Sequence, residues 1–588
     1  MHRSPLAGLL LGLSLAFAGP AFAQEQAADT VQPEIATGAA DKALVRAERQ
    51  MVAAANPLAA QAGLAILRGG GNAIDAMVTT QLVLGLVEPQ SSGLGGGAFL
   101  VFFDAEAGRL TTFDGRETAP AAATPTLFLD EAGEPLSFYD AVVGGRSVGT
   151  PGTVRLLFDT HERYGALPWA SVVQPAIDLA RKGFAVSPRL NALIGEDRER
   201  LSRYPATSDY FFADDGEPLP VGTILTNPAY ADTLATIAEK GAEGFYEGPV
   251  AQGIVDTVRN AAGNPGRLAL SDLAGYAIVE REPVCFAYRA ADVCGMGPPS
   301  SGALTIGQIL GLIAPSDMAA LGPDSPEAWR LIGDASRLAF ADRGRYMADI
   351  DFVPMPLRGL LDPDYLADRA TLLSGEDALA DDAVTPGMPP WDHAMLFGDD
   401  VAIELPSTSH FAIVDDSGNV VSMTTTIENG FGSRLMTGGF LLNNELTDFS
   451  FATHDADGHV IANAVAPGKR PRSSMAPTIV MRDGAPVIAI GSPGGSRIIG
   501  YVAQALIAML DWEMDVQQAI AMPHLVNRFA TFDVEAGTSA TALAAPLRER
   551  GFTVEETDLD SGLHGIVITP DGLEGGADPR REGVAVGD

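Results

Sequence analysis

Residues 410–427, HFAIVDDSGNVVSMTTTI, are the stretch of the chain that decides its fold. Two apolar runs flank an Asp/Gly turn, so this stretch predicts a strand, a turn and a second strand. Residues 438–445 (GGFLLNNE) and 477–492 (PTIVMRDGAPVIAIGS) predict further strands. Because buried helices are expected on both sides of these strands in the sequence, we predict a layered α/β sandwich.

Two helices are predicted near the start of the chain, over 57–68 and 72–87. A run of three glycines ends the first helix, and Asn72 caps the second with Asp75 three positions on. A third helix is predicted over 497–510, and residues 150–350 alternate helical patterns with Gly/Pro turns. This long middle region is expected to be a helical scaffold with few chemical signals.

A glycine-rich loop over 91–97 leads into a strand that ends near residue 104. Residues 93–98 formally match the GxGxxA pattern of dinucleotide-binding loops, but that loop must follow a strand and open a helix. Here a helix precedes the loop and a strand follows it, so we reject a nucleotide site. No Lys-Ser/Thr pair follows either, which excludes a phosphate-binding P-loop.

The composition excludes several classes of protein. The 588 residues include 75 acidic and 38 basic side chains, giving a net charge of −37, and 46% of residues are apolar. This apolar content is too high for a disordered chain, and two cysteines are too few for a disulfide scaffold. Such negative charge argues against nucleic acid and against anionic membranes as partners. No linker or repeat divides the chain.

The N-terminus has the pattern of a secretory signal peptide. His2 and Arg3 precede an apolar run, LAGLLLGLSLAFAG, and Ala21-Phe22-Ala23 forms a cleavage site of the A-x-A kind. The run is shorter than the about 18–20 residues that a membrane span needs. We therefore expect cleavage after Ala23 and a periplasmic or secreted protein without a membrane anchor.

In an oxidising compartment outside the cytoplasm, the two cysteines of the chain could form a disulfide. Cys285 and Cys294 flank FAYRAADV, which predicts two short strands around a turn at Arg289-Ala290. Strand pairing about that turn would place the cysteines opposite each other, so a structural disulfide is expected. Without a nearby histidine, a cysteine nucleophile or a metal pair is disfavoured.

Other familiar chemistries fit the chain poorly. No HExxH, CxxC or His-rich metal pattern is present, and HDADGH (454–459) is interpreted as a polar turn. Ser409 and His410 are adjacent on a predicted strand, so they point to opposite faces and cannot easily pair in a triad. Ser492 lacks the GxSxG pattern of a nucleophile elbow. We expect neither a metal nor an organic cofactor.

A threonine nucleophile fits better, because the chain resembles the gamma-glutamyltranspeptidases, which are N-terminal-nucleophile hydrolases. The resemblance runs from about residue 45 to the end and rests on nine motifs in order. They are GGGNAIDA (69–76), SSGLGGG (91–97), DGRETAP (114–120), PPSSG (298–302), TSHFAIVD (408–415), NNELTDFS (443–450), KRPRSSM (469–475), GSPGGSR (491–497) and ADPRREG (577–583).

The resemblance implies a four-layer αββα sandwich and a precursor that cuts itself between Ser407 and Thr408. Residues 1–23 would be the signal peptide, 24–407 the large subunit and 408–588 the small catalytic subunit, together forming one folded unit. Cleavage would free an α-amino group on Thr408 itself, whose reference pKa of about 7.7–8.0 suits a general base near neutral pH.

The resemblance also implies roles for other site residues. Thr426 would support the nucleophile, and Gly494 and Gly495 would form the oxyanion hole at the start of a helix. Arg116, Ser473 and Ser474 would hold the α-carboxylate of the substrate, and Glu445 and Asp448 would accept its α-ammonium. Taken singly, these residues could be turn glycines, a surface ion pair or polar loop residues; the ordered set favours function.

Two departures from the family pattern stand out. Glu428 lies where many relatives have Asn, which would add a third carboxylate near the ammonium site. The segment 451–468 is shorter than in relatives with a lid and contains no Tyr. A tyrosine-gated lid is therefore not expected, and hydrolysis should compete well with transfer.

The expected activity is cleavage of the γ-glutamyl amide of glutathione or related compounds, with transfer to water or to amino-acid and peptide acceptors. Two alternatives remain open. One is an acylase of the same fold acting on a glutaryl or cephalosporin-type amide, and the other is an inactive relative that binds γ-glutamyl peptides. Retention of Arg116 and Asp448 favours an α-amino acid head group, and Thr408 favours an active enzyme.

Overall fold

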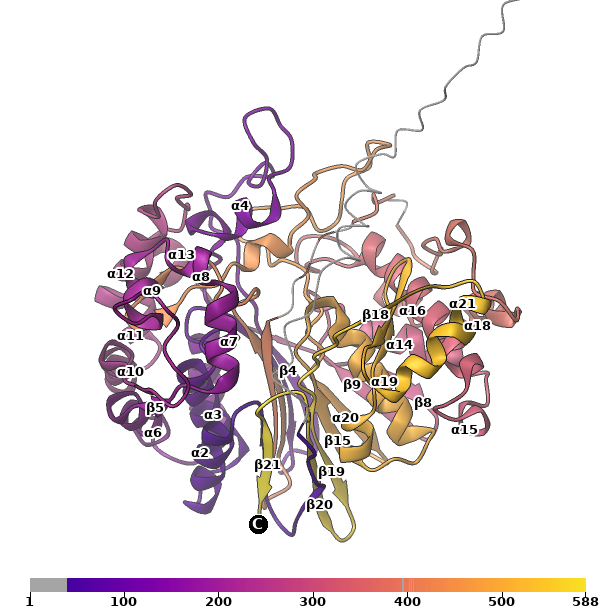
Figure 1. Cartoon of the computed structure of the whole chain (residues 1–588), viewed down its shortest axis with the longest axis horizontal. Helices are drawn as coiled ribbons and strands as arrows, with labels where there is room; N and C mark the ends of the chain where they lie inside the picture. The colour runs from indigo at the N-terminus through magenta and orange to yellow at the C-terminus, as the bar shows by residue number, and fades with distance from the viewer. Residues whose placement is uncertain (1–39, 394–395, 401, 403, 405–406) are drawn as a thin grey trace, which may run out of the picture.

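The computed structural model describes residues 40–393, 396–400, 402, 404 and 407–588 (Figure 1). The signal peptide predicted over 1–23 lies outside these residues. The bond between Ser407 and Thr408 is intact, so the structure is that of the uncut chain. Among the described residues, no helix combines the length and the apolar character needed to cross a bilayer.

Two seven-stranded sheets form the centre of the molecule. In spatial order the first sheet contains β1 (Val45–Ala47), β20 (Gly572–Ala577), β19 (His564–Thr569), β15 (Ala485–Gly491), β14 (Thr478–Arg482), β9 (Ala291–Gly295) and β8 (Val284–Tyr288). The second contains β21 (Val584–Gly587), β2 (Met51–Ala54), β10 (Thr408–Val414), β11 (Val420–Thr426), β3 (Gly97–Asp104), β4 (Arg109–Gly115) and β7 (Val279–Arg281). Each sheet therefore combines strands from both sides of the predicted cut.

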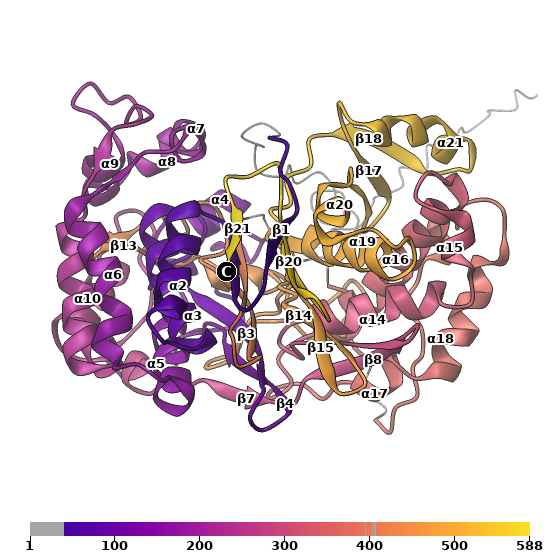
Figure 2. The ribbon, with the colours of Figure 1, turned by 90° about the horizontal axis from the view of Figure 1, so that it is seen from below.

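Helices cover the outer face of each sheet (Figure 2). The second sheet packs on helices from the first half of the chain, and the first sheet on helices from the middle and the end. The former include α2 (Pro57–Arg68), α3 (Ala73–Val87), α5 (Thr153–Tyr164), α6 (Trp169–Lys182), α10 (Pro228–Lys240) and α12 (Gly248–Arg259). The latter include α14 (Gly302–Ile313), α16 (Pro326–Tyr346), α19 (Ile498–Leu510), α20 (Val516–Ala521) and α21 (Ala544–Glu549).

Strand β10 shows why the sheets pack as they do. All seven of its residues are buried, and its side chains alternate between two apolar clusters. Phe411 and Ile413 join the cluster with the helices, whereas Ala412 and Val414 join the cluster between the sheets. This two-residue period is that of a strand buried on both faces. The predicted four-layer αββα sandwich is confirmed.

The local predictions near the start of the chain are also confirmed. Helices α2 and α3 have the predicted bounds to within one residue, and Asn72 and Asp75 form a capping box on α3. The glycine loop leads from a helix into β3, so it lacks the strand-loop-helix order of a nucleotide site.

The middle region is less uniformly helical than its sequence pattern predicts. It contributes β7 to the edge of one sheet and the β8–β9 hairpin to the edge of the other. In this hairpin Cys285 is registered with Cys294, and the two residues form a disulfide. The β8–β9 hairpin is the one predicted around the turn at Arg289-Ala290, whereas β7 was not predicted, because a strand of three residues carries little periodic signal.

Candidate active site

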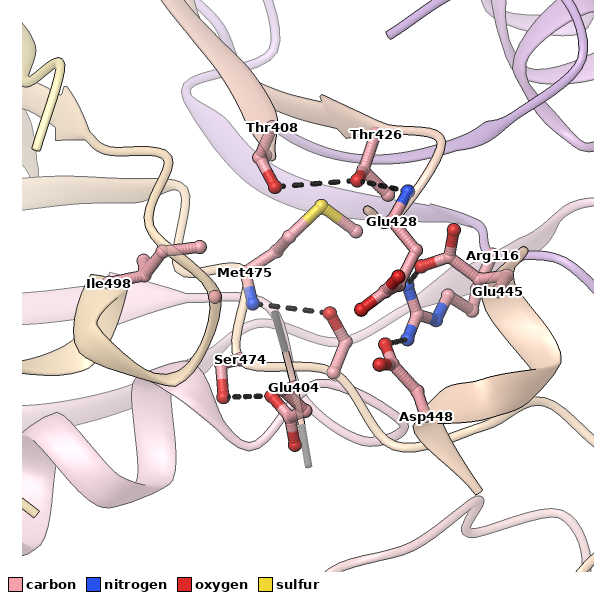
Figure 3. Close-up of a pocket in the computed structure, with 12 residues that line it drawn as sticks. Arg116, Glu404, Thr408, Thr426, Glu428, Glu445, Asp448, Ser474, Met475 and Ile498 are labelled. Carbon is pink, nitrogen blue, oxygen red and sulfur yellow. Dashed lines mark hydrogen bonds and ion pairs between the residues drawn. The ribbon is translucent and has the colours of Figure 1, made fainter. Parts of the chain in front are cut away.

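A small cavity of about 20 Å³ opens where the first residue of β10 meets loops from both sheets (Figure 3). Of the predicted site residues, its lining includes Arg116, Thr408, Thr426, Glu428, Glu445, Asp448, Ser473, Ser474 and Gly495. Glu404, Met475 and Ile498 complete the lining. The pocket thus gathers residues that lie more than 300 positions apart in the sequence.

Thr408 begins β10 and pairs with Thr426, the last residue of β11. Their hydroxyl oxygens are 3.3 Å apart, and both side chains are buried. The Thr426 hydroxyl donates to the carbonyl oxygen of Ser407 at 2.9 Å, and the Glu428 amide donates to the Thr426 oxygen at 2.8 Å. Because Thr426 has a single proton, the Thr408 hydroxyl is the donor to Thr426. The Ser407 carbonyl and the Thr408 hydroxyl therefore share one hydrogen-bonded partner, Thr426.

Ser409 and His410, the two residues that follow Thr408, have different hydrogen-bond partners and do not contact each other through these bonds. The Ser409 hydroxyl donates to Glu88 at 3.4 Å, while His410 is paired with Thr424 at 2.9 Å. Burial lowers the pKa of His410 well below its ordinary value, so this side chain is neutral. The structure agrees with the rejection of a Ser409–His410 dyad.

Arg116 lies at one end of the pocket and is almost fully buried. It follows β4 in the chain, and its guanidinium donates to Glu445 and, at 2.5 Å, to Asp448 (Figure 3). It also donates to the carbonyl oxygen of Arg472 at 2.7 Å. Burial acts to lower the pKa of Arg116, but Glu445 and Asp448 outweigh it and raise the pKa.

More carboxylates than cations surround this end of the pocket. Glu117 and Glu428 lie near the Arg116, Glu445 and Asp448 cluster. Burial raises the pKa of Asp448 well above its ordinary value, and Glu428 adds to the rise although Arg116 opposes it. Burial likewise raises the pKa of Glu445. The excess of buried carboxyl groups favours a bound cation.

Glu428 adopts an unusual backbone conformation. Its φ is +74°, in the left-handed region that non-glycine residues rarely occupy. Its carboxylate accepts a hydrogen bond from the side chain of Asn444, and its amide is the donor to Thr426. The strained residue thus connects Thr426 with the acidic end of the pocket.

The predicted carboxylate-binding serines lie on the loop before β14. The Ser473 hydroxyl accepts from the amide of Met475 at 3.1 Å. The Ser474 hydroxyl donates to Glu404 and accepts from Arg343 at 2.8 Å. In the uncut chain the hydrogen bonds of Arg116 to described side chains go to Glu445 and Asp448, so its guanidinium faces the acidic cluster and not the two serines.

Sequence reasoning missed three charged residues at this end of the site: Glu404, Arg343 and Arg472. Arg343 lies on α16 within a region interpreted as scaffold, and Glu404 lies four residues before Thr408. Arg472, within KRPRSSM, was the available signal, because an arginine beside two predicted binding serines in a buried loop requires an anionic partner.

Gly494 and Gly495 lie between β15 and α19. Gly495 lines the pocket and opens a short 3₁₀ turn, Gly495–Arg497, that runs directly into α19. Gly494 has φ +135°, which favours glycine, and is not among the residues that line the cavity. Backbone N–H groups at this helix start are free of intrahelical partners, as an oxyanion site requires.

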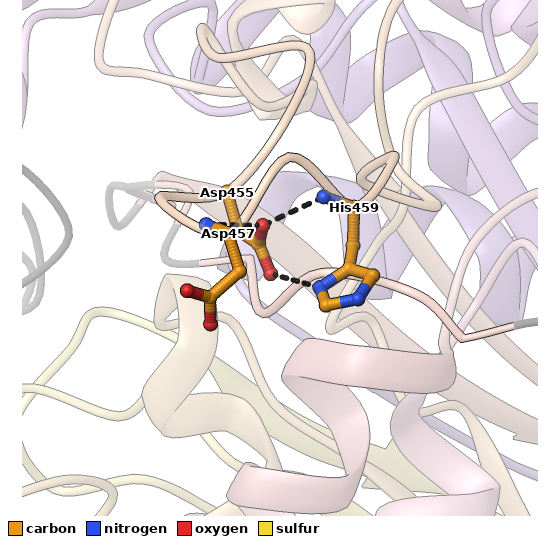
Figure 4. Close-up of side chains that lie close together, drawn as sticks. All are labelled: Asp455, Asp457 and His459. Carbon is orange, nitrogen blue, oxygen red and sulfur yellow. Dashed lines mark hydrogen bonds and ion pairs between the residues drawn. The ribbon is translucent and has the colours of Figure 1, made fainter.

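The HDADGH stretch forms a tight polar turn outside this pocket (Figure 4). Asp455 accepts backbone hydrogen bonds from Asp457 and His459 and also contacts the His459 ring at 3.2 Å. His454 and Val460 bridge across the turn. Asp455 therefore serves the backbone of its own turn, as expected for an Asx-type loop.

Comparisons with known proteins agree with this geometry. Residues 59–588 match the family described as Gamma-glutamyltranspeptidase. A glutathione hydrolase proenzyme of Bacillus subtilis is 36% identical over 549 residues, covering 91% of each protein. A glutathione hydrolase proenzyme of Escherichia coli is 36% identical over 546 residues, again covering 91% of each.

Among solved structures, the fold is similar to that of a cephalosporin acylase from Bacillus halodurans. The TM-score is 0.80 at 28% identity, and the match covers 93% of this chain and 97% of the acylase chain. The relatives from Bacillus subtilis and Escherichia coli are both called proenzymes, which is consistent with two-chain processing. The family match and the extent of these identities lead to one conclusion: the chain belongs to the gamma-glutamyltranspeptidase family.

Proposed function

We propose that this chain is a self-cleaving gamma-glutamyl hydrolase and transpeptidase that acts on glutathione and related γ-glutamyl compounds. The observation that carries the proposal is the placement of Thr408. Its hydroxyl lies in the charged pocket and 3.3 Å from Thr426, which itself donates to the Ser407 carbonyl. The amide to be cut and the nucleophile therefore meet in the same pocket that would hold a substrate.

Self-cleavage follows from this network. The Thr408 oxygen attacks the Ser407 carbonyl carbon while its proton moves to Thr426 and the Thr426 proton moves to the carbonyl oxygen. The tetrahedral intermediate then collapses: the carbon–nitrogen bond breaks, and the nitrogen takes back a proton. The result is an ester between Ser407 and the Thr408 oxygen. Water hydrolyses this ester and gives a Ser407 carboxylate and a Thr408 with a free amino group.

The freed amino group then serves as the base for turnover. It accepts the Thr408 hydroxyl proton as the oxygen attacks the γ-amide of the donor, giving a glutamyl ester and a free amine product. Water or the amine of an acceptor attacks this ester and regenerates Thr408. N–H groups at Gly494 and Gly495 would stabilise the oxyanion in each half-reaction.

The charges of the pocket suit the α-amino acid head group of a glutamyl donor. The α-ammonium would bind among Glu428, Glu445 and Asp448, where carboxyl groups outnumber cations. The α-carboxylate would bind at Ser473 and Ser474, with Arg116 between the two ends. A head group with both charges is bound at both ends, whereas a glutaryl group would leave the acidic end without a cation.

This charge distribution also weighs against the alternatives. An acylase for glutaryl or cephalosporin-type amides shares the fold, as the Bacillus halodurans likeness indicates, but has no need of an acidic end for an ammonium group. An inactive binding relative has no need of a Thr426 hydroxyl that bonds both the Thr408 hydroxyl and the Ser407 carbonyl.

We also propose that the protein is exported and works as two chains, 24–407 and 408–588, after removal of residues 1–23. The site would then combine Arg116 of the large subunit with the remaining predicted site residues of the small one. The Cys285–Cys294 disulfide is consistent with an oxidising compartment.

Two anilide substrates test the activity. L-γ-glutamyl anilide should be hydrolysed at least about tenfold more efficiently than glutaryl anilide, because only the former carries the ammonium group. The measurement is kcat/KM for both substrates with the processed enzyme. Faster cleavage of glutaryl anilide would establish the acylase instead, and cleavage of neither would refute the proposal.

A further inference from the structure

Two buried arginines flank Ser474 on the side of the pocket opposite the nucleophile network. Arg343 is 4% exposed and Arg472 is 1% exposed. Arg343 donates to the hydroxyls of Ser301 and Ser474, both at 2.8 Å. Such cations are stable in a protein interior only when anionic or strongly polar groups neutralise them.

In the uncut chain Glu404 supplies one of these anions. Its carboxylate accepts hydrogen bonds from Arg343 and Ser474 and lies 3.5 Å from the Arg472 Nε (Figure 3 shows its bond to Ser474). Burial acts to raise the pKa of Glu404, but Arg343 and Arg472 outweigh it and lower the pKa. Glu404 is therefore ionised, although it is only 6% exposed.

Asp400 supplies the second anion and is held independently of the pocket. Its carboxylate pairs with Arg472 at 2.9 Å and accepts from Asn463 at 3.1 Å. Its backbone amide donates to the carbonyl oxygen of Gly344 at 3.1 Å. Two arginines thus face two carboxylates, and the charges around Ser474 balance.

Cleavage after Ser407 breaks this balance. Glu404 then belongs to the new C-terminal end of the large subunit and is no longer fixed by its link to Thr408. Without Glu404, Arg343 and Arg472 would retain one carboxylate, that of Asp400, between them. Among the described residues Arg472 Nη1 has no hydrogen-bond partner, and Nε has only its 3.5 Å ion pair with Glu404, so both donors would be available to an anion that takes the place of Glu404.

We propose that Arg343 and Arg472 bind the α-carboxylate of the donor in the cut enzyme, and that Glu404 occupies their place in the uncut chain. This inference rests on the proposed function and deepens it. Glu404 binds the same Ser474 hydroxyl that was predicted to hold the donor carboxylate. A carboxylate on this serine, between two buried arginines, is the arrangement that the donor would reproduce.

Binding to the uncut chain tests the proposal without turnover. The background is Thr408→Ala, and the probes are L-glutamine and L-glutamine α-amide, which differ only in the α-carboxylate. Calorimetry should show that Thr408→Ala/Glu404→Ala binds L-glutamine at least about tenfold more tightly than Thr408→Ala alone. Equal affinity in the two proteins would overturn the proposal, because Glu404 would then not occupy the carboxylate site.

The arginines are tested in the same double variant. Adding Arg472→Met or Arg343→Met should weaken L-glutamine binding about tenfold and leave binding of the α-amide nearly unchanged. Arg472→Lys, which keeps the charge, should retain part of the preference. A preference for L-glutamine that survives both Met variants would also overturn the proposal. Thermal melting identifies any unfolded variant, and Arg472→Gln then replaces Arg472→Met.

Arg345 and Asp399 provide matched controls, because they lie close in sequence to Arg343 and Glu404 but outside the pocket. Arg345 and Asp399 pair at 2.7 Å on the surface, so Arg345→Met and Asp399→Asn should leave both affinities unchanged. Failure of the proposed function would appear separately, as absence of γ-glutamyl anilide hydrolysis by the processed wild type.

Discussion

The Thr426 hydroxyl donates a hydrogen bond to the carbonyl oxygen of Ser407 at 2.9 Å, across the end of the β10–β11 pair. Register places Thr426 directly opposite Thr408, so the same hydroxyl also contacts the nucleophile. Strand pairing thus aligns the three groups that the proposed self-cleavage needs: the Thr408 hydroxyl, the Ser407 carbonyl and the Thr426 hydroxyl.

Thr426→Val should slow self-cleavage by at least about 100-fold, because removal of one donor to a developing oxyanion typically costs 100- to 1,000-fold. Valine keeps the shape of the side chain, and Thr426→Ser keeps the hydroxyl. The rate is followed as loss of the full-length band on a denaturing gel. Cleavage of Thr426→Val at the wild-type rate would remove Thr426 from the mechanism.

Glu428→Asn should raise the KM for γ-glutamyl donors about tenfold and leave the KM for glutaryl anilide nearly unchanged. The substitution removes a carboxylate that faces Asp448, and asparagine tolerates the positive φ at this position. Steady-state kinetics with both substrates provide the measurement. An equal effect on the two would show that Glu428 has no contact with the ammonium group.

Hydrolysis should compete with transfer at low acceptor concentration, because the segment 451–468 contains no Tyr that could gate the pocket. Product analysis with a γ-glutamyl donor and increasing dipeptide gives the partition between free glutamate and γ-glutamyl dipeptide. Transfer alone at low dipeptide concentration would contradict an open site.

Buried histidines should make the fold sensitive to acid. Burial and the nearby Lys42 lower the pKa of His564 to about 3, below the value of about 6.5 expected in the unfolded chain. The unfolded state therefore binds more protons between these values, so stability is full above pH 6.5 and falls as the pH drops toward 3.

His564→Gln should flatten this fall by up to about 1.4 kcal/mol per pH unit between pH 6.5 and 3. Urea unfolding at several pH values measures the slope, and His454→Gln at an exposed turn is the control. Identical slopes for wild type and His564→Gln would show that His564 does not carry the proton difference.

Much of the fold was predictable because its signals are local. A few adjacent residues determine each of three features: the N-terminal cap of α3, the turn between β10 and β11, and the glycine loop before β3. The layered sandwich follows from strands that are buried on both faces. The short edge strand β7 was not predicted, since three residues carry no recognisable period.

The site was predictable only in part, for a related reason. Thr408 stands in the motif TSHFAIVD and Thr426 was assigned by the family resemblance, and strand register brings the two together. The pairing of Glu404 with Arg343 depends on a helix and a loop 61 residues apart that meet only in the folded chain. Charge balance inside a pocket is a property of the tertiary structure, so it cannot be predicted from a local sequence pattern.

Self-cleavage is the claim on which the rest depends, and the two products test it directly. Purified wild-type protein should run as two bands on a denaturing gel, and N-terminal sequencing of the smaller chain should begin at Thr408. Thr408→Ala should remain a single chain under the same conditions. A wild type that stays uncut, or a small chain that begins at another residue, would contradict the mechanism.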